Sequence, residues 1–168
     1  DGESQRNEAV DVFGKMYSPA GGRGAVLDYI HRTGTDALKG ADILATAPDK
    51  YSSSVEYSNT AVGQYMKNIA QTHLAEFGTR IRYTTSPYNG VDTHANQGQL
   101  HGGLWTDVSN TVENFFDDLR EHDAADNVTL FMFTEFGRRI SDNGSGTDHG
   151  ASGVAFAIGD HVKGGIYG

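Results

Sequence analysis

Carboxylate and imidazole side chains gather in two short stretches of the sequence. Asp92 and His94 are two residues apart, so in extended backbone their side chains point to the same side. Asp148 and His149 are adjacent, so in extended backbone they diverge, a pattern suited to bridging two ions or an ion and a substrate. Carboxylate oxygens and neutral imidazole nitrogens bind divalent cations such as Zn²⁺, Mn²⁺, Ca²⁺ or Mg²⁺. These residue types therefore predict a divalent-metal site.

Three further residues are candidates for the same site. Glu135 follows an apolar run and offers another carboxylate, and His101 lies near the start of a predicted helix, as a ligand or a packing residue. Arg138 is a candidate for binding the anionic oxygens of a substrate; its alternatives are a surface charge or an ion pair with Asp142. Taken singly, such residues are often ordinary turn, cap or rim residues. Their coincidence at predicted strand ends favours a site.

Hydrophobic periodicity predicts the elements that must position these residues. Apolar positions at helical spacing predict helices over residues 3–17, 24–46 (with interruptions at Gly34 and Gly40), 58–77 (capped by Ser58 or Asn59) and 99–121. Short strands are predicted over 80–85, 128–133 and 154–158, with a further strand starting at 164. Residues 48–54, 86–97 and 135–150 are predicted to be polar loops. The apolar run 128–133 lacks polar alternation, which is typical of a strand buried on both faces.

This alternation of helices and strands predicts an α/β fold with a mainly parallel sheet flanked by helices. Ligands of such sheets bind beyond the carboxyl ends of the strands. The strand at 80–85 leads towards Asp92 and His94, and the strand at 128–133 leads to Glu135, so the candidate ligands are expected at one edge. The domain organisation predicted from these elements is a helical N-terminal segment or insertion, 1–57, and an α/β core segment carrying the site, 58–168.

Composition narrows the classes of function. The 168 residues include 22 acidic and 13 basic ones, a formal net charge of −9 without a basic patch, so no nucleic-acid partner is expected. The absence of cysteine excludes disulfides and thiolate ligands. No segment approaches the roughly 20 apolar residues of a membrane-spanning helix. The chain begins at Asp1 and stops inside a predicted strand, so we expect a processed or partial chain.

Two blocks of the sequence are distinctive. The first is VDTHANQ, residues 91–97, followed by a helix with His101. The second is FTEFGRRISDNGSGTDHG, residues 133–150, which runs into GVAFAIGDHVKGGIYG. Together they resemble the domain-of-unknown-function 1501 family, which is similar to the alkaline phosphatase and sulfatase superfamily. The resemblance therefore implies an alkaline-phosphatase-like parallel sheet and an esterase centre with one or two metal ions.

The resemblance also implies roles for individual residues. A strand of that superfamily commonly ends in an Asp-His-Gly metal motif. Here Glu135 stands at the predicted strand end and the Asp-His-Gly sequence 148–150 begins 13 residues later, which implies a split motif, with Asp92 and His94 as a second ligand group. The superfamily's first ligand and nucleophile have no counterpart in residues 1–54, so the fold and site are expected to be incomplete. Members often carry an export signal, which implies a periplasmic or extracellular location.

Two hypotheses of function follow. The first is an exported, metal-dependent hydrolase of phosphate or sulfate esters, with an anionic ester as its substrate. Its metal ligands would be Asp92, His94, Glu135, Asp148 and His149. His101 would be a further ligand or would hydrogen-bond to a ligand, and Arg138 would bind the anion. The alternative is a non-catalytic binding or assembly protein that retains the fold. Packing or surface roles are predicted for the other four histidines, His31, His73, His122 and His161.

Overall fold

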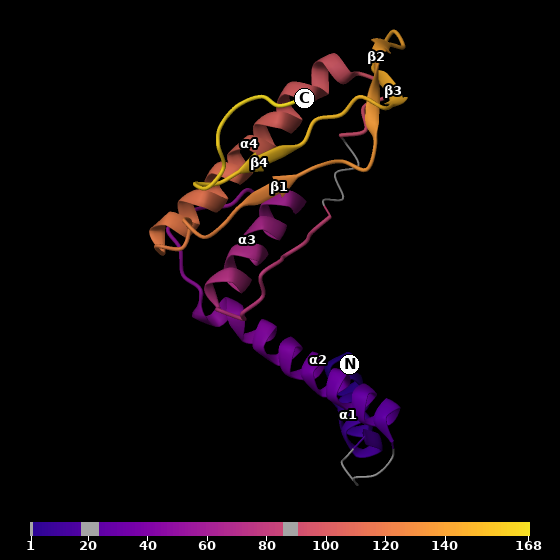
Figure 1. Cartoon of the computed structure of the whole chain (residues 1–168), viewed down its shortest axis with the longest axis vertical. Coiled ribbons are helices and arrows are strands. Elements are labelled where there is room, and N and C mark those ends of the chain that lie inside the picture. The colour runs from indigo at the N-terminus through magenta and orange to yellow at the C-terminus, as the bar shows by residue number, and fades with distance from the viewer. Residues whose placement is uncertain (1, 18–23, 86–90) are drawn as a thin grey trace. The chain divides into compact units, whose positions relative to one another are not determined.

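A computed structural model of the chain describes residues 2–17, 24–85 and 91–168 (Figure 1). Residues 86–90, part of the predicted loop 86–97, lie outside the described residues. The contacts divide the chain into two compact units, Asp1–Lys50 and Tyr51–Gly168. About half of the chain is helical, in α1 (Gly2–Tyr17), α2 (Ala25–Lys50), α3 (Ala61–Leu74) and α4 (Gln97–Glu121). The strands are β1 (Leu130–Met132), β2 (Gly137–Asp142), β3 (Thr147–Gly150) and β4 (Phe156–Ile158).

The first unit consists of α1 and α2, so the helices predicted over 3–17 and 24–46 are confirmed. α2 continues through Gly34 and Gly40 and takes in Pro48, so the predicted polar loop begins only after Lys50. The ring of Phe13 lies against Gly34, where an added Cβ would lie 2.0 Å from the ring's Cζ atom. Glycine at this position therefore permits the close contact between the two helices. None of the described helices is both long and apolar enough to cross a membrane.

In the second unit, α3 and α4 pack together, and β1 and β4 lie beside them (Figure 1). The apolar faces predicted for the two helices are confirmed in part, because Met66, Phe115, Phe116 and Leu119 are buried whereas Tyr65 and Leu100 are exposed. The buried core comprises Met66, Ala70, Phe115, Phe116, Leu119 and Ala125. The N-cap of α3 is Thr60 and not Ser58 or Asn59, because the Thr60 hydroxyl accepts a hydrogen bond from the Gly63 amide at 3.3 Å.

A fully buried carboxylate, that of Asp118 on α4, ties the segment before α3 to the core. The hydroxyls of Tyr51 and Tyr57 donate hydrogen bonds to its Oδ2 atom at 2.6 and 2.8 Å. Burial, followed by the hydrogen bond to Asp118, raises the pKa of both tyrosines above the ordinary value. Both phenols therefore remain protonated donors, which a buried carboxylate requires for its stability.

The predicted α/β fold, with a mainly parallel, alkaline-phosphatase-like sheet, is wrong. The strands of the described residues form two separate two-stranded sheets, β1 with β4 and β2 with β3, and both are antiparallel. β1 pairs directly with β4, with Leu130 opposite Ile158. The predicted strands at 80–85 and from 164 are also wrong, because neither segment pairs with another strand in the described structure. Local apolar patterns predicted these strands, but pairing between distant segments decides which of them form.

The apolar run 128–133 is buried on one face only, so the prediction of two buried faces is wrong. Leu130 packs against the core of α3 and α4, whereas Phe131 and Phe133 are 62% and 57% exposed. The reason is that helices cover a single face of this sheet in the described part of the chain. The predicted loop 135–150 is also corrected, because it contains β2, a tight turn and β3.

Candidate metal centre

The hairpin of β2 and β3 carries half of the predicted site. Its turn is closed by side chains: Asn143 Oδ1 accepts hydrogen bonds from the amides of Ser145 and Gly146 at 3.1 and 2.8 Å. Gly144 has φ +93°, a conformation that favours glycine. Arg138 pairs with His149 across the two strands. Cross-strand partners share a face, so both side chains leave the same side of the hairpin.

The tip of the hairpin docks on the start of α4. The carbonyl of Ser145 accepts from the Gln97 amide, and its hydroxyl accepts from the Asn96 amide, each at 3.0 Å. These bonds satisfy amides that a helix start otherwise leaves without partners. Gly146 is buried here, and an added Cβ would lie 2.3 Å from the carbonyl oxygen of Thr93. This docking brings the two stretches of predicted ligands together.

Three side chains present their ligand atoms to one point. Nε2 of His94 lies 3.1 Å from Nε2 of His149 and 3.2 Å from Oδ1 of Asp92, and Nε2 of His149 lies 3.1 Å from the same Oδ1. Ligand atoms around a tetrahedral zinc ion, bound at about 2.0–2.1 Å, lie about 3.3 Å apart. The three atoms therefore match one face of a coordination shell. Their side chains are 42–50% exposed, so a substrate can reach the face from solvent.

Asp148 lies behind this triangle of ligand atoms, on the other nitrogen of His94. Its Oδ1 atom is 3.2 Å from Nδ1 of His94 and accepts a hydrogen bond from the side-chain Nδ2 of Asn143 at 3.0 Å. The bonds from Asn143 and then from His94 lower the pKa of the Asp148 carboxyl. An ionised carboxylate only accepts hydrogen bonds, so if an ion were held at Nε2 of His94, Nδ1 would carry the proton and donate it to Asp148.

Arg138 is anchored in the same cluster and does not pair with Asp142. Its guanidinium donates hydrogen bonds to Oδ1 of Asp92 and, at 2.8 Å, to the carbonyl of Thr147. Partial loss of solvation raises the pKa of Asp92, but the bond with His149 and the charge of Arg138 outweigh it and lower the pKa overall. Asp92 is therefore ionised at neutral pH, as a metal ligand must be.

An aromatic ring that the sequence analysis missed supports His149. The rings of Phe136 and His149 stack with their centroids 3.9 Å apart and their planes inclined by 24°. The Arg138 guanidinium carbon lies 5.6 Å from the centroid of the same Phe136 ring. Asn143 was missed as well, although it holds both Asp148 and, through a 3.1 Å bond, the carbonyl of His94. The Asp-Asn-Gly sequence signalled a turn, and nothing in it indicated that the amide would reach two site residues.

Besides Asp148, two predicted ligands lie outside the triangle, His101 and Glu135. Nε2 of His101 accepts a hydrogen bond from the Trp105 indole at 2.9 Å, one turn further along α4. That bond engages the lone pair of Nε2, which fits the packing alternative, and a ligand role for His101 stays a prediction. Glu135 is exposed just before β2 and is not among the residues that gather into the cluster in the described structure.

Comparison with known proteins gives one match. The sequence profile of a family described as "Protein of unknown function (DUF1501)" matches residues 23–168. No curated protein and no solved structure matches the chain. The match covers both stretches of candidate ligands, from the segment before α4 to the hairpin of β2 and β3.

Proposed function

The chain belongs to the DUF1501 family of proteins of unknown function, and we propose that it is a metal-dependent hydrolase of phosphate or sulfate esters. The observation that carries the proposal is the triangle of ligand atoms from Asp92, His94 and His149. Two imidazole nitrogens and one carboxylate oxygen are a ligand set of catalytic zinc sites, which keep one position open for reaction. We expect Zn²⁺ ahead of Mn²⁺, and both ahead of Mg²⁺ and Ca²⁺, which prefer oxygen ligands.

The residues around the triangle suit an anionic ester. A bound divalent ion would supply Lewis-acid chemistry, polarising an ester oxygen and favouring attack by water at neutral pH. Arg138 donates one N–H to Asp92 and another to the carbonyl of Thr147. Its remaining N–H groups would be donors for the oxygens of a phosphate or sulfate. In this proposal, the likeness to alkaline phosphatases and sulfatases rests on the Asp-His-Gly sequence 148–150 alone. It does not include a parallel sheet.

Metal content of the purified full chain tests the proposal. We expect near-stoichiometric zinc by elemental mass spectrometry in the wild type and in a His161→Ala control, which removes an exposed histidine elsewhere. His149→Ala should lose the metal while its circular dichroism and melting temperature stay near those of the metal-free wild type. Hydrolysis of p-nitrophenyl phosphate or p-nitrophenyl sulfate should fall with the metal. No zinc after reconstitution, or turnover that survives His149→Ala, would contradict the proposal.

The second candidate function, a non-catalytic binding or assembly protein, has one observation in its favour. Phe131 and Phe133 stack on each other at 5.4 Å between ring centroids, and both are largely exposed. Exposed aromatic side chains on one face are common where proteins bind partners. This candidate predicts no turnover and a loss of self-association in Phe131→Ser/Phe133→Ser, measured by sedimentation velocity. An unchanged sedimentation coefficient would remove the support.

Export is the further part of the proposal, and it rests on the family resemblance. We expect the protein in the periplasm or outside the cell, where an ester hydrolase would meet external substrates. Fractionation of cells that express the natural gene tests this expectation. Recovery only with the cytoplasmic marker would contradict it.

A further inference from the structure

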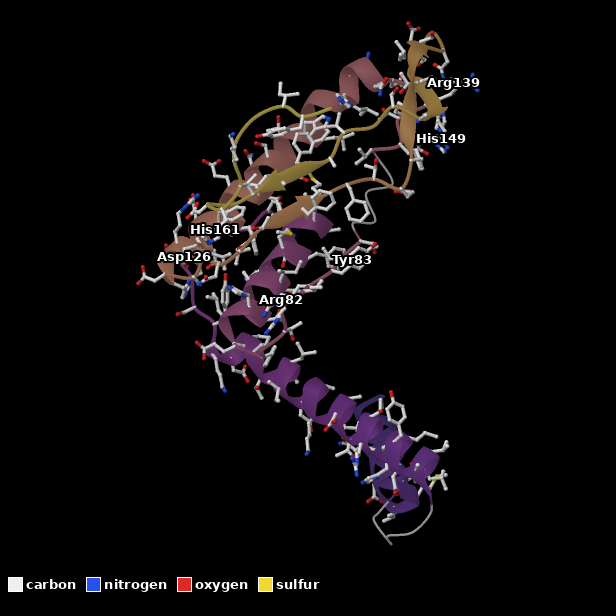
Figure 2. The ribbon with its side chains drawn as sticks, in the orientation of Figure 1. Arg82, Tyr83, Asp126, Arg139, His149 and His161 are labelled. Atoms are coloured by element: carbon white, nitrogen blue, oxygen red, sulfur yellow. The ribbon has the colours of Figure 1, made fainter. Side chains whose placement is uncertain are left out.

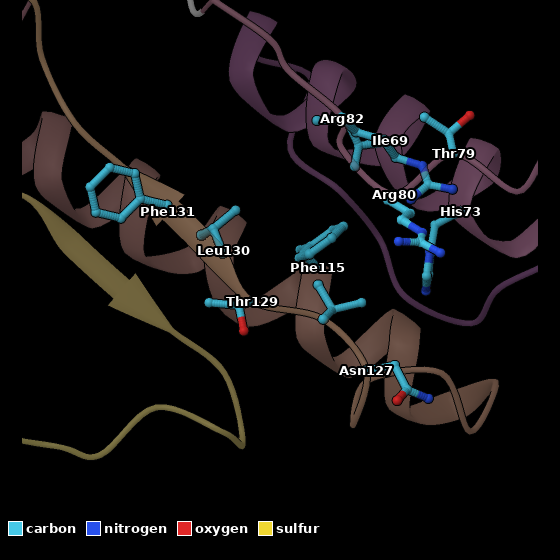
Figure 3. A pocket seen from close by; sticks show the side chains of 11 residues that line it. Ile69, His73, Thr79, Arg80, Arg82, Phe115, Asn127, Thr129, Leu130 and Phe131 are labelled. Carbon is cyan, nitrogen blue, oxygen red and sulfur yellow. The ribbon is translucent and has the colours of Figure 1, made fainter.

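A cavity of about 340 Å³ lies between α3, the segment 79–82, α4 and β1 (Figure 3). Its lining includes the apolar side chains of Ile69, Phe115 and Leu130. It also carries the guanidinium groups of Arg80 and Arg82, which Figure 3 shows away from Leu130 and Phe131. The cavity thus combines apolar side chains with two positively charged groups. Its volume is at the lower end of the range for sites of small ligands.

The positive charge of this cavity has no partner in the described part of the chain. None of the residues that line it is acidic, and neither Arg80 nor Arg82 forms an ion pair there. This is notable in a protein with a formal net charge of −9. Two unpaired guanidinium groups beside an apolar wall are chemically suited to an anion with an apolar body.

Arg82 is the more deeply placed of the two arginines. Its Nη2 donates a long hydrogen bond of 3.3 Å to the carbonyl of Thr72, and its Nε is buried without a hydrogen-bond partner. A buried donor without an acceptor is unfavourable, especially on a charged group. An anionic oxygen inside the cavity would supply an acceptor.

The neighbouring His73 does not add to the charge. Burial, followed by the positive charge of Arg82, lowers the pKa of His73 below its ordinary value. Its Nε2 lies 3.4 Å from the carbonyl of Ala124 on the side of the core. The two arginines therefore carry the positive charge of this cavity at neutral pH.

We propose that this cavity binds a small organic anion, with a phosphate or carboxylate head on Arg80 and Arg82 and a compact apolar body against Phe115, Leu130 and Phe131. Guanidinium groups bind both kinds of head through paired N–H donors. The site shares no residue with the candidate metal centre. Figure 2 shows Arg82 well away from His149 and the hairpin. The proposal is thus independent of the proposed hydrolase.

Calorimetric titration of the full chain tests this inference, with EDTA present to keep the metal centre empty. The probes are phenyl phosphate and benzoate, which differ in the head, with inorganic phosphate as the probe that lacks the apolar body. At least one aromatic anion should bind, at least tenfold more tightly than inorganic phosphate. Arg80→Gln changes an exposed residue and should weaken that binding about tenfold or more. Arg32→Gln, which removes the same charge from the first unit, should leave it unchanged.

A second variant and a map of the contacts complete the test. Phe131→Ala, at a largely exposed position, should weaken phenyl phosphate but not inorganic phosphate. Amide chemical-shift changes should centre on Ile69, Phe115 and Leu130. Shifts centred on the hairpin residues 137–150, equal affinity in the wild type and Arg80→Gln, or no binding of either aromatic anion would each overturn the inference.

Discussion

Nδ1 of His94 lies 3.2 Å from Oδ1 of Asp148, while Nε2 of the same ring lies 3.1 Å from Nε2 of His149. The two ends of one imidazole therefore have different tasks. The Asp148 carboxylate orients the ring through Nδ1, and the opposite nitrogen faces Asp92 and His149. Residue types alone made Asp148 and His94 equal candidates as ligands, and the geometry favours a positioning role for Asp148, which stays a prediction.

This arrangement predicts different effects for the two residues. Asp148→Asn should weaken zinc binding roughly 10- to 100-fold without abolishing it, because the tautomer and orientation of His94 are no longer fixed. His94→Ala should abolish binding, because a ligand atom is lost. Competition titration against a fluorescent zinc chelator measures both, with the exposed Asp160→Asn as control. Equal losses in Asp148→Asn and His94→Ala would instead identify Asp148 as a ligand.

A second prediction concerns the docking of the hairpin. Gly146→Ala should destabilise the docked hairpin by about 1–3 kcal/mol, because the new methyl group overlaps the Thr93 carbonyl and the backbone must shift. Zinc affinity should fall in parallel. The control is Gly102→Ala, inside α4 with no atom in reach of the new Cβ, which should stabilise the protein by about 0.5–1 kcal/mol. Urea unfolding and zinc titration of both variants provide the measurement.

If Gly102→Ala and Gly146→Ala lowered the unfolding free energy equally, the conformational freedom of glycine, and not the contact with Thr93, would explain the effect. A stabilised Gly146→Ala variant with normal zinc affinity would contradict the docking described here.

A third prediction concerns the core of the second unit. Leu119→Ala removes a side chain with no exposed surface between α3 and α4, and should cost about 2–5 kcal/mol of unfolding free energy. Leu100→Ala, at a position of α4 that is half exposed, should have a much smaller effect. The single tryptophan, Trp105, lies in this unit and reports its urea unfolding by fluorescence. Similar losses in the two variants would contradict the assigned core.

A fourth prediction concerns pH and His122. Its ring nitrogens lie 2.7 and 2.8 Å from the carbonyls of Asp118 and Ser52, an arrangement that suits a protonated imidazole donating both bonds. The bond to Asp118 raises the pKa of His122, burial opposes this, and the bond to Ser52 adds to it. The folded pKa thus lies above the unfolded one, so the contribution to stability is full below about pH 6.5 and is lost as pH rises through the folded pKa.

Urea unfolding at about pH 5.5 and about pH 8.5 checks this sign. The difference in unfolding free energy between the wild type and His122→Gln should be larger at the lower pH. The exposed His161→Gln should give a difference that does not depend on pH in this way. A larger His122 difference at the higher pH would contradict the proposed protonation.

The helices could be predicted because their pattern is local. Val62, Met66 and Ile69 repeat along one face of α3, and that stripe is enough to place the helix within a few residues. The sheet of β1 and β4 could not be predicted, because β1 pairs with residues that follow it by more than twenty positions. Nothing in the apolar run 128–133 showed that only one of its faces would be covered.

Part of the candidate site could be predicted from the sequence, because some of its residues are recognisable by chemical type alone. Asp92, His94 and His149 were selected by chemical type, and the structure brings their ligand atoms together, although metal binding stays a prediction. Asn143 and Phe136 were missed because an amide in a turn and a lone phenylalanine carry no signal of their own. Their contacts exist only after β2 and β3 have paired.

The separation of the ligands along the chain has a consequence for folding. Asp92 and His94 lie 57 and 55 residues before His149, with α4 and β1 between them. An ion held by all three would act as a reversible crosslink that closes this long loop. Since it binds the folded arrangement only, free ion at 100 times the dissociation constant would add about 2.7 kcal/mol of stability. The melting temperature of the second unit would then be a gauge of the free metal concentration around the protein.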